Sequence, residues 1–304
     1  MAIELSVYAF ALTAVLTPAI GRLMMRLRVV GRDVNKENGH AVPEHVGIAF
    51  VASFSVFFLM LVYAYGKVEM LWALAAALAV SAFGLADYKF AFKPRVKLVF
   101  PFVAGLMLMP AIYQFDGGWK VLYAILLAAG FMASSNFTNM LGGFNGIEAG
   151  MSALASAGLA VFFYLQGYMF ESYSLLLLFA CLAGFLLYNL YPASVFPGDS
   201  GTMFCGAVIA SIVLLSPYPY VLPLALAPHI ADAWLKFRSA GVMSRSDFKP
   251  VVLKKGRLYL PKKGYRSLAR HFLRKPLTEP QLVARVLSTE VLVVLLLALW
   301  GWLA

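Results

Sequence analysis

The stretch Asn136-Phe-Thr-Asn-Met-Leu-Gly-Gly-Phe-Asn-Gly-Ile-Glu148 decides how the rest of the chain is interpreted. It places three amides and a carboxylate between two strongly apolar segments, at about 119–136 and 147–166. Polar groups of this kind are costly in a bilayer core unless they line a polar site. A second polar stretch follows at Tyr191-Pro-Ala-Ser-Val-Phe-Pro-Gly-Asp199. If both stretches open on the same side of a membrane, they can form one pocket for a metal ion and a phosphate.

The composition indicates a membrane protein built from helices. Of the 304 residues, 62% are hydrophobic, and the mean hydropathy is +0.81, whereas soluble domains are nearer half apolar. Apolar runs of about 18 residues, long enough to cross a bilayer as a helix, recur along the chain. The sequence therefore predicts an all-α polytopic membrane protein with ten transmembrane helices, at about 4–22, 46–65, 70–87, 98–115, 119–136, 147–166, 172–190, 202–216, 218–236 and 286–304.

The domain organisation is expected to be simple. The two cysteines, Cys181 and Cys205, both fall in expected helices, which excludes a disulfide framework and a thiolate zinc site. The first apolar segment has no basic start and no clear cleavage site, so we expect it to be an anchor. The sequence contains no P-loop, no dinucleotide-binding glycine motif and no Ser-His-Asp order. We expect one transmembrane domain over 1–304, with a basic cytoplasmic insertion at 237–285 that contains a small β-hairpin near 254–261.

The distribution of basic residues predicts the orientation. Of the 25 lysines and arginines, 23 lie in the connections between expected helices 1 and 2, 3 and 4, and 9 and 10, while only Lys67 and Lys120 lie elsewhere. Because cytoplasmic loops carry an excess of basic residues, these connections are expected in the cytoplasm and both termini outside. The two polar stretches then open on the cytoplasmic face. The basic insertion can also contact lipid headgroups, at about 1 kcal/mol per basic residue near an anionic surface.

Asp199 is the first candidate metal ligand. It follows a Pro-Gly turn that can present a carboxylate at the membrane boundary. Mg²⁺ takes one or two protein oxygens and completes its shell with water and substrate phosphate, so Asp199 with the amide oxygen of Asn139 would suit it, and Mn²⁺ is an alternative. Simpler roles stay open: a helix N-cap for Asp199, helix-end caps for Asn136, Asn139 and Asn145, and a helix-start carboxylate for Glu148.

Asp87 and Lys97 form a second candidate group. Asp87 ends the third expected helix and Lys97 begins the fourth, so together they would place an acid and a phosphate-binding cation at one mouth. Each residue alone is also typical of a boundary side chain that snorkels to the headgroups. The loop between the first two helices adds four candidates that could equally be solvated: Asp33, Asn35, Lys36 and Glu44. The histidines have no metal-ligand spacing, and His229 could simply pair with Asp232.

Four motifs in order, on one expected face, resemble a known family. They are Asp33-Val-Asn-Lys36 with Pro43-Glu44, Gly84-Leu-Ala-Asp87 followed by Lys97, the stretch 136–150, and Pro192-Ala-Ser-Val-Phe-Pro-Gly-Asp199. With the ten-helix layout, they resemble the polyprenyl-phosphate N-acetylhexosamine-1-phosphate transferase superfamily (glycosyltransferase family 4). The form Asn-Gly-Ile-Glu-Ala-Gly is similar to the eukaryotic and archaeal branch, which makes dolichyl-pyrophosphate N-acetylglucosamine.

The resemblance implies a Mg²⁺-dependent reaction. N-acetylglucosamine-1-phosphate would pass from UDP-N-acetylglucosamine to a polyprenyl, dolichyl-type phosphate, with release of UMP, as the first membrane step of glycan assembly such as N-glycosylation. In that family, Asn139 and Asp199 would hold the metal on the diphosphate, Lys97 would neutralise diphosphate charge, and Asp87 would lie beside the lipid phosphate. The uracil would lie between Phe196 and Gly143. The substrate-binding residues that the resemblance implies are Asp33, Asn35, Lys36, Glu44, Asn136, Gly143, Asn145, Glu148, Phe196, Arg245 and Lys249.

Two departures from the family pattern support other hypotheses. The family has paired aspartates after the third helix, and here the second position is Tyr88. Its last cytoplasmic loop carries a His-rich or Arg-His-Arg cluster, where this chain has Arg245-Ser-Asp-Phe-Lys249. A catalytically lapsed relative that binds nucleotide sugar or lipid is therefore one alternative. A polytopic transporter is another, although transporter sites usually lie near the midplane. Besides the substrates, we expect the lipid bilayer as a partner and no nucleic acid, and a homodimer stays open.

Overall fold

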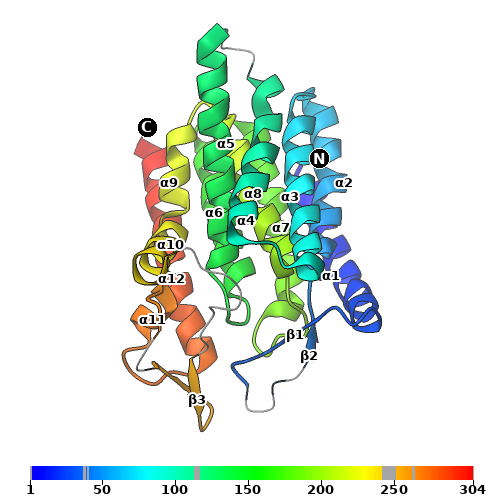
Figure 1. Ribbon diagram of the computed structural model, residues 1–304. Helices are drawn as coiled ribbons and strands as arrows, with labels where there is room; N and C mark the ends of the chain where they lie inside the picture. Colours follow the sequence, from blue (N-terminus) through cyan, green and yellow to red (C-terminus); the bar gives the residue numbers. More distant parts are fainter. Residues whose placement is uncertain are drawn as a thin grey trace.

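The part of the protein that the structure describes is a bundle of roughly parallel helices with two short β-hairpins at one end (Figure 1). The computed structural model describes residues 2–36, 39, 41–112, 117–241, 251–261 and 264–303. Within them the longer helices are α1 (Ala2–Arg26), α2 (Ile48–Tyr65), α3 (Met70–Phe90), α4 (Pro94–Gly105), α5 (Gly117–Met140), α6 (Ile147–Leu165), α7 (Met169–Asn189), α8 (Gly198–Leu214), α10 (Ala227–Ala240) and α12 (Glu279–Leu303). The short helices are η1 (Leu106–Ala111), η2 (Pro219–Val221), α9 (Leu222–Ala225) and α11 (Leu268–Phe272).

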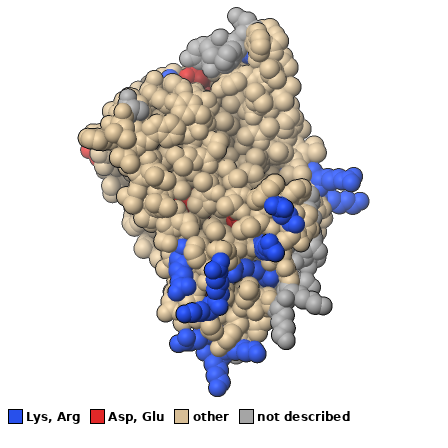
Figure 2. Space-filling model, turned by 90° about the vertical axis from the view of Figure 1, so that its left-hand side faces the viewer, with Lys and Arg blue, Asp and Glu red and all other residues tan. Residues whose placement is uncertain are grey.

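Both hairpins lie at the same end of the bundle (Figure 1). β3 (Val252–Lys254) pairs with β4 (Arg257–Tyr259) in antiparallel register, which confirms the hairpin predicted in the basic insertion. β1 (Val30–Arg32) pairs with β2 (Ala41–Pro43) in the connection between α1 and α2 and was not predicted. Lysine and arginine gather at the end of the molecule that carries these strands, below a largely uncharged surface (Figure 2).

The chain is a multi-pass integral membrane protein. In the residues that the structure describes, eight helices are long and apolar enough to cross a membrane, namely α1, α2, α3, α4 with η1, α5, α6, α7 and α12. The shorter helix α8 is also apolar. The prediction of a single helix over 218–236 is wrong, because the chain forms η2, α9 and α10 there. Proline lacks an amide hydrogen and clashes with the preceding turn, so Pro219, Pro223 and Pro228 divide the segment.

Helix α8 lies at the centre of the bundle, with α3 and α5 packed along it. Its residues 200–213 are all buried, as expected for a helix that is apolar on every side. Two glycines permit this close packing. A Cβ at Gly206 would lie 2.2 Å from the carbonyl oxygen of Ser134 in α5, and a Cβ at Gly84 in α3 would lie 2.6 Å from the carbonyl carbon of Asp199. The first turn of α8 is thereby held directly against α3.

Candidate functional site

Lys97, in the first turn of α4, lies between two carboxylates. Its ammonium donates to Asp87 near the end of α3, and its Nζ lies 3.5 Å from Oδ2 of Asp199 in the first turn of α8. Asp87 is buried and also accepts the N–H of Phe92 at 2.9 Å. Three helices therefore bring one ammonium and two carboxylates together. We call Asp87, Lys97 and Asp199 the lysine cluster.

Two of the asparagines lie on a helix that is longer than predicted. Helix α5 continues to Met140, so Asn136 and Asn139 lie on its last turns and not in a loop. The Asn136 amide donates to the carbonyl of Lys97 at 3.2 Å, which fixes the start of α4 against α5. Asp199 lies inside the first turn of α8, whose N-cap is Pro197, so an N-cap role for Asp199 is wrong.

Asn139 and Asp199 could hold a metal ion, because an amide oxygen and a carboxylate are donor types that Mg²⁺ takes. Oδ1 of Asn139 accepts a hydrogen bond of 2.6 Å from the hydroxyl of Thr202, so the amide oxygen faces α8 one turn from Asp199. The Asp199 side chain keeps 28% of its surface exposed. No three His, Cys, Asp or Glu side chains converge as metal ligands in the part of the chain that the structure describes. Mg²⁺ does not need such a cage, because water and phosphate oxygens complete its shell.

A second cluster surrounds Asn145, in the loop between α5 and α6. Its Nδ2 donates to Asp33 at 3.1 Å, and its Oδ1 accepts hydrogen bonds from Lys36 at 3.3 Å and from the N–H of Ala193 at 2.9 Å. Its own N–H donates to Oε1 of Glu279 at 2.7 Å, and Lys36 donates to Oε2 of Glu279 at 2.6 Å. We call Asp33, Lys36, Asn145 and Glu279 the asparagine cluster. It joins three segments that are far apart in the sequence.

Glu279 is the main residue of this site that the sequence motifs missed. The last helix was predicted to begin at 286, whereas α12 begins at Glu279. Two further contacts were also unexpected. The ammonium of Lys36 lies 3.7 Å from the centre of the Tyr191 ring, which makes Tyr191 a cation–π partner. Thr202, which orients Asn139, belongs to none of the motifs.

The remaining predicted residues lie beside these clusters. Nδ2 of Asn35 donates to the carbonyl of Gly143 at 2.7 Å, while its buried Oδ1 has no donor among the described residues. Phe196 and Glu44 both lie against β1, since a Cβ at Gly31 would stand 3.3 Å from the Phe196 ring and 3.2 Å from a Glu44 oxygen. Glu148, in the first turn of α6, folds back onto Gly142 of the preceding loop.

Tyr88 stands at the position where the family that the sequence resembles has a second aspartate, and its hydroxyl contacts β1. It accepts the N–H of Val30 at 3.2 Å and lies 3.4 Å from the carbonyl oxygens of Arg28 and Val30. Its ring meets His45 edge to face at 5.3 Å between centres. Tyr88 thus ties the first hairpin to the end of α3, next to the lysine cluster.

Two further expectations concern His229 of α10 and the basic insertion. His229 does not pair with Asp232, because its Nδ1 lies 3.8 Å from Glu290 of α12 while Asp232 pairs with Lys236 at 2.7 Å. That alternative is wrong. Arg245 and Lys249, expected to bind substrate, lie outside the described residues.

Comparison with known proteins identifies relatives of the chain. Residues 70–216, which include the lysine cluster, match the family described as Glycosyl transferase family 4. A protein of Methanocaldococcus jannaschii, provisionally named a glycosyltransferase, is 37% identical over 91% of this chain and 89% of its own length. A Saccharolobus solfataricus protein is provisionally named UDP-N-acetylglucosamine–dolichyl-phosphate N-acetylglucosaminephosphotransferase. It is 29% identical over 84% of this chain and 83% of its own length. The Schizosaccharomyces pombe protein with that name is 27% identical over 75% of this chain and 65% of its own length.

Proposed function

Because this chain belongs to glycosyl transferase family 4 and is a phosphoglycosyl transferase, we propose that it transfers N-acetylglucosamine-1-phosphate from UDP-N-acetylglucosamine to a dolichyl-type polyprenyl phosphate. The sugar and the lipid are suggested by the names of the more distant relatives. The observation that carries the proposal is the lysine cluster beside Asn139. It combines a cation for phosphate with oxygens for a divalent metal at the end of a membrane bundle.

The reaction exchanges one phosphoanhydride bond for another. An oxygen of the lipid phosphate attacks the β-phosphorus of the UDP-sugar, the bond from that phosphorus to the bridging oxygen breaks, and UMP leaves with the bond electrons. The second pKa of a phosphomonoester is near 6, so the nucleophile is mostly ionised at neutral pH without a strong base. Phosphoryl transfer then depends on positioning and on charge neutralisation, so Tyr88 in place of a second aspartate is compatible with turnover.

The lysine cluster supplies that positioning. Asn139 and Asp199 would hold Mg²⁺, which when bound would stabilise negative charge on the diphosphate oxygens. Lys97 would donate to the same diphosphate, held in place by the Asn136 contact to its carbonyl. Asp87 keeps the Lys97 ammonium oriented and would lie beside the incoming lipid phosphate.

The asparagine cluster is the proposed site for the nucleotide and sugar. Asn145 and Asp33 offer an amide and a carboxylate, and the buried oxygen of Asn35 can accept a hydrogen bond from a ligand. Phe196, beside β1, is the aromatic residue available to stack on uracil. From the basic residues of the alternate connections, we propose that both clusters face the cytoplasm and that the termini lie outside.

The test is UMP release by the purified protein in lipid nanodiscs with UDP-N-acetylglucosamine, a polyprenyl phosphate and Mg²⁺. Asp199→Ala should abolish UMP release without unfolding the protein, because it removes the charged oxygen proposed for the metal. Glu69→Ala is the matched control, since Glu69 is a carboxylate in the turn before α3 that pairs with Lys67 at 4.0 Å. Absence of UMP with a panel of UDP-sugars and lipids would refute the proposal. Retained activity in Asp199→Ala would remove that residue as a metal ligand.

A further inference from the structure

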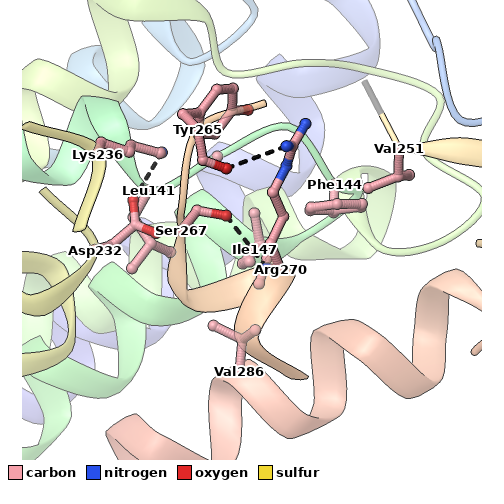
Figure 3. Close-up of a pocket in the computed structure, with 12 residues that line it drawn as sticks. Leu141, Phe144, Ile147, Asp232, Lys236, Val251, Tyr265, Ser267, Arg270 and Val286 are labelled. Carbon is pink, nitrogen blue, oxygen red and sulfur yellow. Dashed lines mark hydrogen bonds and ion pairs between the residues drawn. The ribbon is translucent and has the colours of Figure 1, made fainter. Parts of the chain in front are cut away.

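Lys236 of α10 lies outside both clusters and yet contacts the helix that carries Asn139. It is buried, and its ammonium donates to the carbonyl of Met140, the last residue of α5. Figure 3 shows Lys236 beside Asp232 at the edge of a pocket that Leu141 and Arg270 also line. None of the sequence motifs includes Lys236 or Asp232.

Asp232 extends this contact to the basic insertion. Its Oδ2 lies 2.7 Å from Nζ of Lys236, and its Oδ1 accepts the N–H of Leu268, the first residue of α11, at 2.7 Å. The guanidinium of Arg270 stacks on the Tyr265 ring at 4.3 Å in the same pocket. Burial raises the pKa of the Tyr265 hydroxyl and lowers the pKa of Arg270, as expected where water is scarce. A continuous series of contacts therefore joins the end of α5, α10 and α11.

The setting of Lys236 explains why this contact matters. A buried ammonium is costly unless it is paired and hydrogen-bonded, and Lys236 is both. Its partner carbonyl ends a helix, where the partial negative charge of the helix favours a cation. Met140 directly follows Asn139, and the loop that leads to Asn145 begins after it. This contact therefore fixes the backbone next to the Asn139 side chain and at the start of that loop. Without the ammonium, the carboxylate of Asp232 would be buried without its cation and the end of α5 could shift.

We propose that Lys236 is a positioning residue of the transferase, which together with Asp232 sets the position of Asn139 and of the following loop without contacting substrate. The inference rests on the proposed function, because that function makes Asn139 a metal ligand. It also gives the basic insertion a second role besides headgroup contact. Through Asp232 and Lys236, α11 supports the end of α5, which carries Asn139.

The experiment compares Lys236→Met with Lys236→Arg. UMP release is measured over a range of Mg²⁺ concentrations, and Mn²⁺ binding in the presence of UDP is measured by electron paramagnetic resonance. Loss of a group that supports a metal ligand typically weakens binding by 10- to 100-fold, so Lys236→Met should raise both the Mg²⁺ requirement and the Mn²⁺ dissociation constant by about tenfold. Lys236→Arg should recover most of the loss, since it keeps a charge and donors at the same place.

Arg238→Met is the matched control. Arg238 lies on the same helix, is exposed, and stacks on Trp234 at 5.6 Å, so its loss should leave both metal curves unchanged. If Lys236→Met does not fold, Lys236→Gln is used instead, because its shorter, uncharged side chain loses the ion pair with Asp232 and weakens the contact with Met140, so it should also raise both metal constants. Wild-type metal curves in a folded Lys236→Met or Lys236→Gln protein would overturn the inference, as would a wild-type protein that binds no Mn²⁺ with UDP. Wild-type protein that binds Mn²⁺ but releases no UMP would instead overturn the proposed function, and the Mn²⁺ measurement would still test Lys236.

Discussion

Gly84→Ala should slow the transfer reaction without unfolding the protein. A Cβ at this position would lie 2.6 Å from the carbonyl carbon of Asp199 and 2.6 Å from the nitrogen of Ser200, both backbone atoms of α8. Ordinary contact begins at 3.4 Å, so α3 and α8 would have to separate by about 0.8 Å. Asp87 follows Gly84 by one helical turn, so this separation would move Asp87 and Lys97 relative to Asp199.

The expected size of the effect follows from that displacement. A misplacement of about 1 Å among reacting groups can cost about 100-fold in rate, which is about 2.7 kcal/mol of barrier. Stability should change less. Overpacking costs about 1–3 kcal/mol, while replacing a helical glycine with alanine returns about 1 kcal/mol. We therefore expect kcat to fall by about 100-fold while the protein remains folded.

The assay is UMP release at saturating substrates, with a thermal unfolding curve for each variant. Gly130→Ala is the matched control, because this glycine also lies inside a membrane helix and an added Cβ would meet only the flexible side chain of Leu214, at 3.0 Å. Gly130→Ala should keep near wild-type activity. A Gly84→Ala protein with more than about a third of the wild-type rate, or an equal loss in both variants, would show that the contact between α3 and α8 does not set the rate.

Two further substitutions test individual contacts. Lys97→Met should lower the initial rate of UMP release by about 100-fold, because it removes the only cation of the lysine cluster. Lys97→Arg should retain part of the activity. Equal rates in Lys97→Met and wild type would contradict this role. Tyr88→Phe should raise KM for UDP-N-acetylglucosamine by about 2- to 10-fold with little change in kcat, because the hydrogen bonds of the hydroxyl to the chain at the first hairpin are lost. A substrate titration in which kcat falls and KM stays constant would place Tyr88 with the reacting groups instead.

The sequence could predict which segments carry polar groups, but helix ends were harder to place. Runs of apolar residues locate the middle of a membrane helix, and its polar first turn falls outside the run. Glu279 was missed for this reason. A signal for it does exist in the sequence: Thr278 and Gln281 have the spacing of a capping box, and Gln281 accepts the N–H of Thr278 at 3.1 Å. With Pro280 favourable in a first helical turn, these residues mark the start of α12.

Other features depend on tertiary contacts that no local pattern encodes. The carbonyl that receives Lys236 belongs to a residue 96 positions earlier, and the pairing of Lys236 with Asp232 resembles any surface pair at four-residue spacing. A three-residue spacing on the same helix likewise made His229 a candidate partner of Asp232. The sequence showed Asn139 as one member of the polar stretch 136–148 but not the direction of its side chain. That direction depends on a hydrogen bond from Thr202 of α8, which packs against α5.

The charges of the lysine cluster suggest an order for the proposed reaction. One ammonium and two carboxylates carry a net charge of −1, and both carboxylates compete for the same cation. This arrangement disfavours the approach of an anionic lipid phosphate. With a divalent cation at Asp199 and Asn139, the same groups would carry +1, and Lys97 would no longer be shared with Asp199. The metal therefore has to bind before the site attracts a phosphate group, and once bound it leaves Lys97, beside Asp87, available to the diphosphate.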